Sequence, residues 1–96
     1  MIEYSYSLHA LMRIKKREIK SEWIENTINS PDEIVYLEGT EVVCFLGIIN
    51  DCNKKCLKVV VNIISKTIIT IHFDRKWKRR IENENKNRQW RERSLY

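Results

Sequence analysis

The sequence has 96 residues, of which 43% are hydrophobic, with a formal net charge of +5 and three cysteines. A chain of this length fits one domain and buries too little surface to enclose a large substrate cavity, so we expect any site on the surface. The positive charge favours a polyanionic partner, RNA in the first place, while charge alone leaves an acidic protein or a membrane surface open.

The N-terminal residues and the cysteines predict the compartment. Residues 1–10, "MIEYSYSLHA", lack a basic start followed by an apolar stretch, so they do not resemble a secretory signal. The longest apolar run, "VVVNIIS", is too short to cross a bilayer. An odd number of cysteines agrees with a reducing compartment. We therefore expect a cytoplasmic protein with no membrane association.

Two short helices are predicted at the start of the chain. Ser7 can cap a helix that runs from Leu8 to about Arg17. Its expected buried arc is apolar and consists of Leu8, Leu11, Met12 and Ile14. The opposite arc carries His9, Arg13, Lys16 and Arg17. A second helix starts at Ser21, ends before Pro31 and buries Trp23, Ile24, Thr27 and Ile28. Together the two form a helical hairpin.

Four strands follow, over residues 33–37, 41–49, 56–64 and 67–73, and their short connections predict an antiparallel sheet. Alternation places Leu57, Val59, Val61 and Ile63 toward the helices, and likewise Thr67, Ile69, Ile71 and Phe73. The other face carries Lys58, Asn62, Thr70 and His72. The predicted fold class is α+β, a helical hairpin packed on one face of a four-stranded antiparallel sheet.

Residues 76–96 form a basic C-terminal extension to the predicted domain of residues 1–75. The large apolar side chains of this extension are Trp77, Ile81, Trp90 and Leu95, and their spacing allows a weakly amphipathic helix. Aromatic rings among cations can stack on unpaired bases. A solvated helix that docks on its own domain fits the same residues equally well.

A candidate site for RNA cleavage combines His9, Arg13 and Arg17 with Thr70. Metal-independent ribonucleases need a proton acceptor, a proton donor, and cations that stabilise charge on the phosphorus. Histidine serves either proton-transfer role, and arginine and threonine donate to phosphate oxygens. The same stripe on a two-faced helix is also what solvation alone predicts. Further residues expected to bind substrate are Lys16, Lys58, His72 and Arg75.

The cysteines do not predict a metal centre. Zinc sites favour short paired spacings with four ligands, and the chain has no such pair of pairs. Cys44 is expected in the core, and Cys52 and Cys56 in a loop. We predict no metal and no cofactor.

The spacing of the N-terminal residues resembles that of a known family. "S-x-HA-xx-R-x-xx-R-x-I" at residues 7–19, "SEWIENTINSP" and the late "TIITI" are similar to a bacterial and archaeal family of domains of unknown function. The signature of that family is a serine, HA, RM and RGI, followed by an amphipathic helix and four strands. It also resembles polymorphic-toxin domains grouped with the barnase, EndoU, colicin and RelE-type ribonuclease fold. The resemblance covers residues 5 to about 74.

The resemblance implies a toxin-like endoribonuclease in which His9 transfers a proton, Arg13 and Arg17 bind phosphate and Thr70 donates to it. It also implies an antitoxin partner. Ile14 replaces the usual methionine, and Glu18 the usual glycine, which suggests that the first helix ends differently. The alternative from another functional class is a non-catalytic module that binds RNA or an acidic protein.

Overall fold

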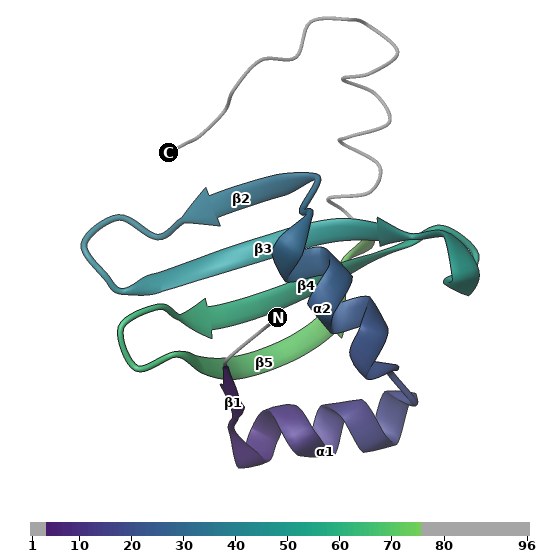
Figure 1. Cartoon of the computed structure of the whole chain (residues 1–96), viewed down its shortest axis with the longest axis horizontal. Coiled ribbons are helices and arrows are strands. Elements are labelled where there is room, and N and C mark those ends of the chain that lie inside the picture. Colours follow the sequence, from purple (N-terminus) through teal and green to yellow (C-terminus); the bar gives the residue numbers. More distant parts are fainter. Residues whose placement is uncertain (1–3, 76–96) are drawn as a thin grey trace, which may run out of the picture.

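The computed structural model describes residues 4–75, which form two α-helices and one five-stranded sheet (Figure 1). The elements in chain order are β1 (Ser5–Tyr6), α1 (Leu8–Arg17), α2 (Ser21–Asn29), β2 (Glu33–Tyr36), β3 (Val42–Ile49), the short 3₁₀ turn Asn50–Cys52, β4 (Lys55–Asn62) and β5 (Thr67–Phe73). The predicted α+β class is confirmed. The extension predicted over residues 76–96 lies outside the described residues.

The sheet has one strand more than predicted. Its order is β1-β5-β4-β3-β2, and β1 runs parallel to β5 while the other pairs are antiparallel. Two backbone hydrogen bonds attach the extra strand, from Ser5 N to Lys66 O at 2.9 Å and from Ser7 N to Ile68 O at 3.0 Å. A strand of two residues is too short to show an alternating pattern, so hydrophobic periodicity does not predict it.

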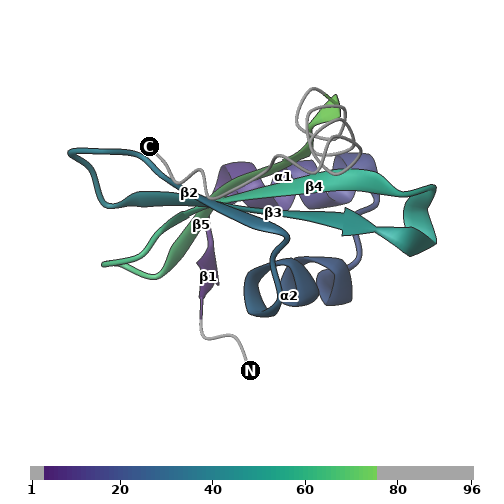
Figure 2. The same ribbon diagram turned by 90° about the horizontal axis from the view of Figure 1, so that it is seen from above.

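The two helices occupy different positions, so the predicted hairpin on one face is wrong. Helix α2 packs on β3 and β4, whereas α1 contacts β5 and β1. Figure 2 shows α2 on one side of the sheet and α1 near the level of the strands, beside β5. Gly47 in β3 allows the close approach of α2, because a Cβ atom there would lie 3.3 Å from Thr27 Oγ1.

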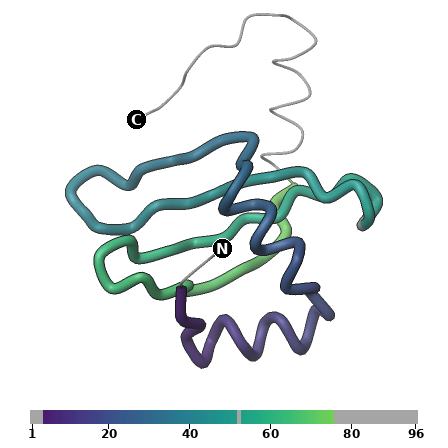
Figure 3. The backbone as a smooth tube through the Cα atoms, viewed as in Figure 1, coloured from purple at the N-terminus to yellow at the C-terminus, as the bar shows by residue number. Residues whose placement is uncertain are grey.

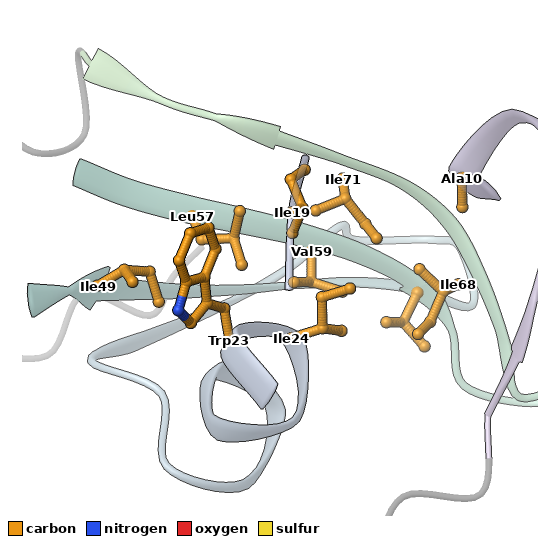
Figure 4. Close-up of a cluster of buried hydrophobic side chains, with 10 residues drawn as sticks. Ala10, Ile19, Trp23, Ile24, Ile49, Leu57, Val59, Ile68 and Ile71 are labelled. Carbon is orange, nitrogen blue, oxygen red and sulfur yellow. The ribbon is translucent and has the colours of Figure 1, made fainter. Parts of the chain in front are cut away.

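The main core lies between α2 and the sheet. It consists of Ala10, Ile19, Trp23, Ile24, Ile49, Leu57, Val59, Val61, Ile68 and Ile71. Figure 4 shows the Trp23 indole beside Leu57 and Ile49. The predicted buried stripe of α2 is confirmed, since Trp23, Ile24 and Thr27 are buried and Ile28 packs partly buried against this core. The hydroxyl of Thr27 donates to Trp23 O at 2.8 Å, which satisfies the polar group in the apolar interior.

A β-bulge in β5 changes which side chains face the core. Val60 pairs with Thr70 while the next residue, Val61, pairs with Ile68, so Ile69 is an extra residue in the ladder. Ile68 and Ile71 are three residues apart and both are fully buried in the core. The predicted placement of Thr67 and Ile69 on the same side as Ile71 is therefore wrong.

The predicted inward residues of β4 are confirmed for three of four positions. Leu57, Val59 and Val61 are fully buried, whereas Ile63 is 39% exposed. Ile63 belongs to the turn between β4 and β5, which spans residues 63–66. Figure 3 shows this turn at the same end of the sheet as the turn between β2 and β3.

The buried side of helix α1 differs from the predicted one. Leu8, Leu11 and Met12 are 79%, 45% and 67% exposed, so the prediction that they are buried is wrong. Ala10 is fully buried and Ile14 is partly buried against the core. Helix α1 contacts the sheet only at its edge, along β5 and β1, so it buries a narrow strip, and the small side chain of Ala10 lets the backbones approach. Among the described residues, no helix is long and apolar enough to span a membrane.

Both ends of α1 have identifiable caps. Ser7 Oγ accepts from Ala10 N at 3.0 Å and donates to Ile69 O at 2.8 Å. At the other end Glu18 adopts a left-handed conformation, with φ 54° and ψ 49°. The next residue, Ile19, donates to Ile14 O at 3.0 Å and enters the core. The expectation that Glu18 ends the helix differently is wrong, because it takes the backbone shape that glycine favours.

We predict that Ser7→Ala lowers the free energy of unfolding by about 1–2 kcal/mol, because the helix cap and the bond to β5 are lost together. Urea denaturation measures the change. Ser21→Ala is the matched control, since Ser21 is exposed at the start of α2 and should change stability by less than about 0.5 kcal/mol. Equal effects of the two substitutions would contradict the double role of Ser7.

We predict that Glu18→Gly raises the free energy of unfolding by about 0.5–1 kcal/mol, because glycine adopts the left-handed conformation without steric cost. Glu25→Gly, at an exposed position within α2, should lower it by about 1 kcal/mol. The two glutamate-to-glycine changes therefore have opposite expected signs in the same denaturation assay. A loss of stability in Glu18→Gly would contradict the strain assigned to this residue.

Candidate functional site

The candidate site lies on the face of the sheet away from α2, here called the opposite face. Strand register places Leu46, Lys58 and His72 directly beside one another across β3, β4 and β5. The neighbouring row is Cys44, Val60 and Thr70. Thr70 and His72 thus share this face with Lys58, as alternation within the last strand predicted.

Arg13 reaches this region from α1. Its Nε atom donates a long hydrogen bond of 3.4 Å to Ile71 O, at the edge of β5. The charges of Arg13 and Lys58 both act on the His72 imidazole. Three residues predicted from the sequence, on three different elements, are therefore close enough to interact electrostatically.

His72 has a lowered pKa for identifiable reasons. Burial disfavours the charged imidazolium first, and the positive charges of Lys58 and Arg13 disfavour it further, while Asp74 acts in the opposite direction. The pKa of His72 thus lies below the ordinary value of 6.5. The imidazole is mostly neutral at neutral pH, and a neutral imidazole can accept a proton.

His9 lies on the first turn of α1 and is exposed. Ser7 is bonded to Ile69 and Arg13 to Ile71, so the helical turn between them runs alongside this part of β5 (Figure 1). His9 forms no hydrogen bond with another residue of the described range 4–75. Its position is therefore set by α1 alone.

The structure places the remaining predicted site residues outside the group of Arg13, Lys58 and His72. Lys16 and Arg17 are exposed on α1, and Arg75 is exposed just after β5. Within the described part of the chain, none of these three is hydrogen-bonded to Arg13, Lys58 or His72. Arg17 shares the arc of Arg13 by helical spacing, one turn further along α1.

The prediction from sequence missed Asp74. This carboxylate raises the pKa of His72 and also that of Cys56. Its backbone N–H donates to Cys56 O at 2.9 Å, which extends the pairing of β4 and β5 by one residue. The alternation of positions 70, 72 and 74 was the available signal, since it places Asp74 on the face of Thr70 and His72.

Two cysteines lie on the opposite face as free thiols. Cys44 and Cys56 are 5% and 2% exposed. The prediction of a loop position for Cys56 is wrong, because β4 begins at Lys55. Burial raises the pKa of Cys56 to about 12, with a further contribution from Asp74, so the thiol stays protonated. The described residues contain no group of three or more His, Cys, Asp or Glu side chains arranged to hold a metal ion.

A family profile for a domain of unknown function, DUF4258, matches residues 6–72 of the chain. The chain belongs to the DUF4258 family. The match includes α1, α2 and the sheet up to His72, and it therefore contains Arg13, Lys58 and His72. No curated protein and no solved structure matches this DUF4258 domain.

We predict that the pKa of His72 rises toward 6.5 in Lys58→Met and in Arg13→Met, because each substitution removes a neighbouring positive charge. Asp74→Asn should lower it. NMR titration of the imidazole Cε1 proton measures each value, and His72→Gln assigns the signal. Because the pKa in the folded state lies below that of the unfolded chain, the contribution of His72 to stability is present at neutral pH and is lost as the pH falls below about 6.5.

Lys54→Met is the charge-matched control, since Lys54 is exposed in the turn before β4. It should leave the His72 titration almost unchanged. A pKa of His72 above 6.5, or an equal response to Lys54→Met and Lys58→Met, would contradict the arrangement of charges on the opposite face.

Proposed function

We propose that this DUF4258 domain is a toxin-like endoribonuclease that cleaves RNA without a metal ion. The observation that carries the proposal is the convergence of Arg13, Lys58 and a neutral His72 at the junction of α1 and the sheet. A neutral imidazole beside two cations meets two requirements of phosphodiester cleavage at once. The first is a proton acceptor, and the second is positive charge for the phosphate.

In the proposed reaction the ribose 2′-oxygen attacks the adjacent phosphorus. His72 accepts the proton of the 2′-hydroxyl as the new oxygen–phosphorus bond forms. Arg13 and Lys58 stabilise the negative charge on the five-coordinate phosphorus, and Thr70 donates a hydrogen bond to a phosphate oxygen. His9 protonates the leaving 5′-oxygen as its bond to phosphorus breaks. The products are a 2′,3′-cyclic phosphate and a 5′-hydroxyl.

The position of α1 supports this division of roles. Arg13 is anchored to Ile71 O, and His9 lies one turn earlier on the same arc, alongside residues 69–71 of β5. The exposed side chain of His9 can therefore approach a phosphate held by Arg13. Lys16, Arg17 and Arg75 are exposed around this point and extend the positive surface for flanking phosphates. An antitoxin that covers this surface is the protein partner proposed by analogy with toxin systems.

The test is an RNA-cleavage assay in EDTA with wild type, His9→Gln and His72→Gln. Loss of either proton-transfer group should slow cleavage by about 10²- to 10⁴-fold. Products are analysed for 2′,3′-cyclic phosphate ends. Lys54→Gln is the charge control, because Lys54 is exposed in the turn before β4 and is not among the charges that act on His72, and this variant should retain the wild-type rate.

Cleavage by both histidine variants at the wild-type rate would contradict the mechanism. Cleavage that requires a divalent cation would contradict the metal-independent reaction. Each variant is first compared with wild type by far-UV circular dichroism, so that a lost activity is assigned to the site and not to unfolding.

A non-catalytic RNA-binding module is the second candidate. It is favoured by one observation, namely that a single histidine of the two in the chain lies beside Arg13 and Lys58. Binding of RNA without cleavage needs only the positive charges of Arg13 and Lys58. In that case His72→Gln should retain affinity for RNA while Arg13→Gln weakens it, and the affinity should fall with salt by about 0.7 logarithmic units per decade for each phosphate contact to a single strand.

A further inference from the structure

The large hydrophobic side chains that are exposed within residues 4–75 fall into two groups. The first group lies on α1 and consists of Leu8, Leu11 and Met12. The second group lies at the turn after β2 and the turn after β4, and consists of Tyr36, Leu37, Ile63 and Ile64. Exposed apolar side chains that gather in a patch mark a contact surface, whereas scattered single ones are normal.

The first group belongs to one stripe of α1 that ends in a positive charge. Leu8, Leu11, Met12 and Lys15 follow helical spacing, so they share one side of the helix, here called the outer stripe. Arg13 lies off this stripe, since it bonds Ile71 O at the edge of β5. Helix α1 contains no Asp or Glu. The outer stripe is therefore apolar over its first two turns and positive at its end.

The second group is accompanied by carboxylates. Glu38 and Glu41 are exposed in the turn of residues 37–41. The two turns are joined, because Ile63 N donates to Glu41 O at 3.0 Å. Residues 36–41 and 63–66 are here called the turn patch, and Lys66 is the one cation among them. The turn patch is therefore apolar with a net negative charge.

The two patches meet at one end of the molecule. Ser5 N donates to Lys66 O at 2.9 Å, and α1 starts three residues later at Leu8. Figure 1 shows the start of α1 at the end of the sheet that carries both turns. The strand order β2-β3-β4-β5-β1 then fixes a sequence along the surface. It runs from the carboxylates of the β2–β3 turn, through the apolar side chains of both turns and of α1, to Lys15.

We propose that these patches join two copies of this chain in a two-fold dimer, in which the outer stripe of each copy packs on the turn patch of the other. A two-fold rotation reverses the order of the surface. Lys15 of each copy then faces the carboxylates Glu38 and Glu41 of the other, and the apolar side chains meet between them. Two-fold dimers are the commonest oligomers, and each contact occurs twice in them.

Charge favours a second copy over other occupants. Two outer stripes packed on each other would bring positive ends together with no carboxylate between them. An anionic lipid surface would attract Lys15 but repel Glu38 and Glu41. The turn patch of a second copy offers both the apolar area and the negative charge that the outer stripe lacks.

The dimer is separate from the proposed RNA site. Neither patch includes Arg13, Lys58 or His72, and the opposite face with Thr70 is outside both patches. The dimer therefore does not rest on the proposed cleavage of RNA, and loss of one would not imply loss of the other.

The first test is sedimentation equilibrium of the full chain over a range of concentrations. Wild type should dimerise. Leu8→Ser with Met12→Ser, and Leu37→Ser with Ile64→Ser, should each raise the dissociation constant by about tenfold or more. The four replaced side chains are 79%, 67%, 42% and 69% exposed in the single chain, and far-UV circular dichroism checks that the variants fold. Glu22→Ser with Glu25→Ser, at exposed positions of α2, is the control and should leave the constant unchanged.

The second test reverses charges. Lys15→Glu should weaken the dimer by about tenfold, and so should Glu38→Lys with Glu41→Lys, because each places like charges against one another. All three substitutions in one chain restore opposite charges and should return the dissociation constant to within about threefold of wild type. This restoration is expected only if the outer stripe of one copy meets the turn patch of another.

Four outcomes would overturn the proposal. They are a wild-type chain that stays monomeric up to about 1 mM, serine variants that dimerise like wild type, charge reversals that do not restore each other, and assemblies that grow beyond a dimer. A monomeric wild type that sediments with phosphatidylglycerol vesicles, and no longer does so with Leu8→Ser and Met12→Ser, would assign the outer stripe to a lipid surface and would also overturn it.

Discussion

The attachment of α1 to the exposed edge of β5 is the interaction on which the rest of the candidate site depends. Ser7 Oγ donates a hydrogen bond to Ile69 O, and Arg13 Nε donates one to Ile71 O, so the helix is attached at two places along the strand. The contact orients the helix about its own axis. It brings the charge of Arg13 close enough to act on the His72 imidazole, and it leaves Leu8, Leu11 and Met12 exposed.

The edge of β5 is available because β1 pairs only with its first two residues. Ser5 and Tyr6 pair with Thr67 and Ile68, and beyond that point the ladder on this side ends. The bulge at Ile69 follows directly, and it rotates the rest of the strand so that Ile71 faces the main core and His72 the opposite face. Strand β1, the bulge and α1 thus act as one structural unit at the edge of the sheet.

Local pattern predicted the elements well and their assembly poorly. The last strand was predicted at 67–73, the same bounds as β5, because it is β-branched, apolar and flanked by turn residues. The bulge could not be predicted, since it is a property of pairing between two strands and changes no residue preference within one. The prediction of which side of α1 is buried failed for a similar reason. An amphipathic helix at a sheet edge buries a narrow strip, here around Ala10, and that strip need not be its most apolar arc.

The candidate site was predictable in its residue types and only partly in its geometry. Arg13 was predicted as a catalytic residue, and Lys58 and His72 only as substrate-binding residues. The charges of Arg13 and Lys58 both act on His72 in the structure, which moves the proposed proton acceptor from His9 to His72. Helical spacing predicted that His9 lies on the same side of α1 as Arg13. It could not predict which strand residues that side of the helix contacts. Asp74 was missed because a carboxylate has no obvious role in a phosphate site, although its effect on His72 opposes that of the two cations.

The same electrostatics links substrate binding to proton transfer in the proposed reaction. In the free protein, burial and the charges of Lys58 and Arg13 lower the pKa of His72, so the imidazole is neutral but a weak proton acceptor. A bound phosphate places negative charge against those cations and offsets their effect on the imidazole. If RNA binds as proposed, the pKa of His72 should rise in the complex, and the imidazole should take up the 2′-hydroxyl proton more readily at the step that requires it. A site that only binds phosphate has no need for this coupling, and a histidine flanked by two cations supplies it without any further residue.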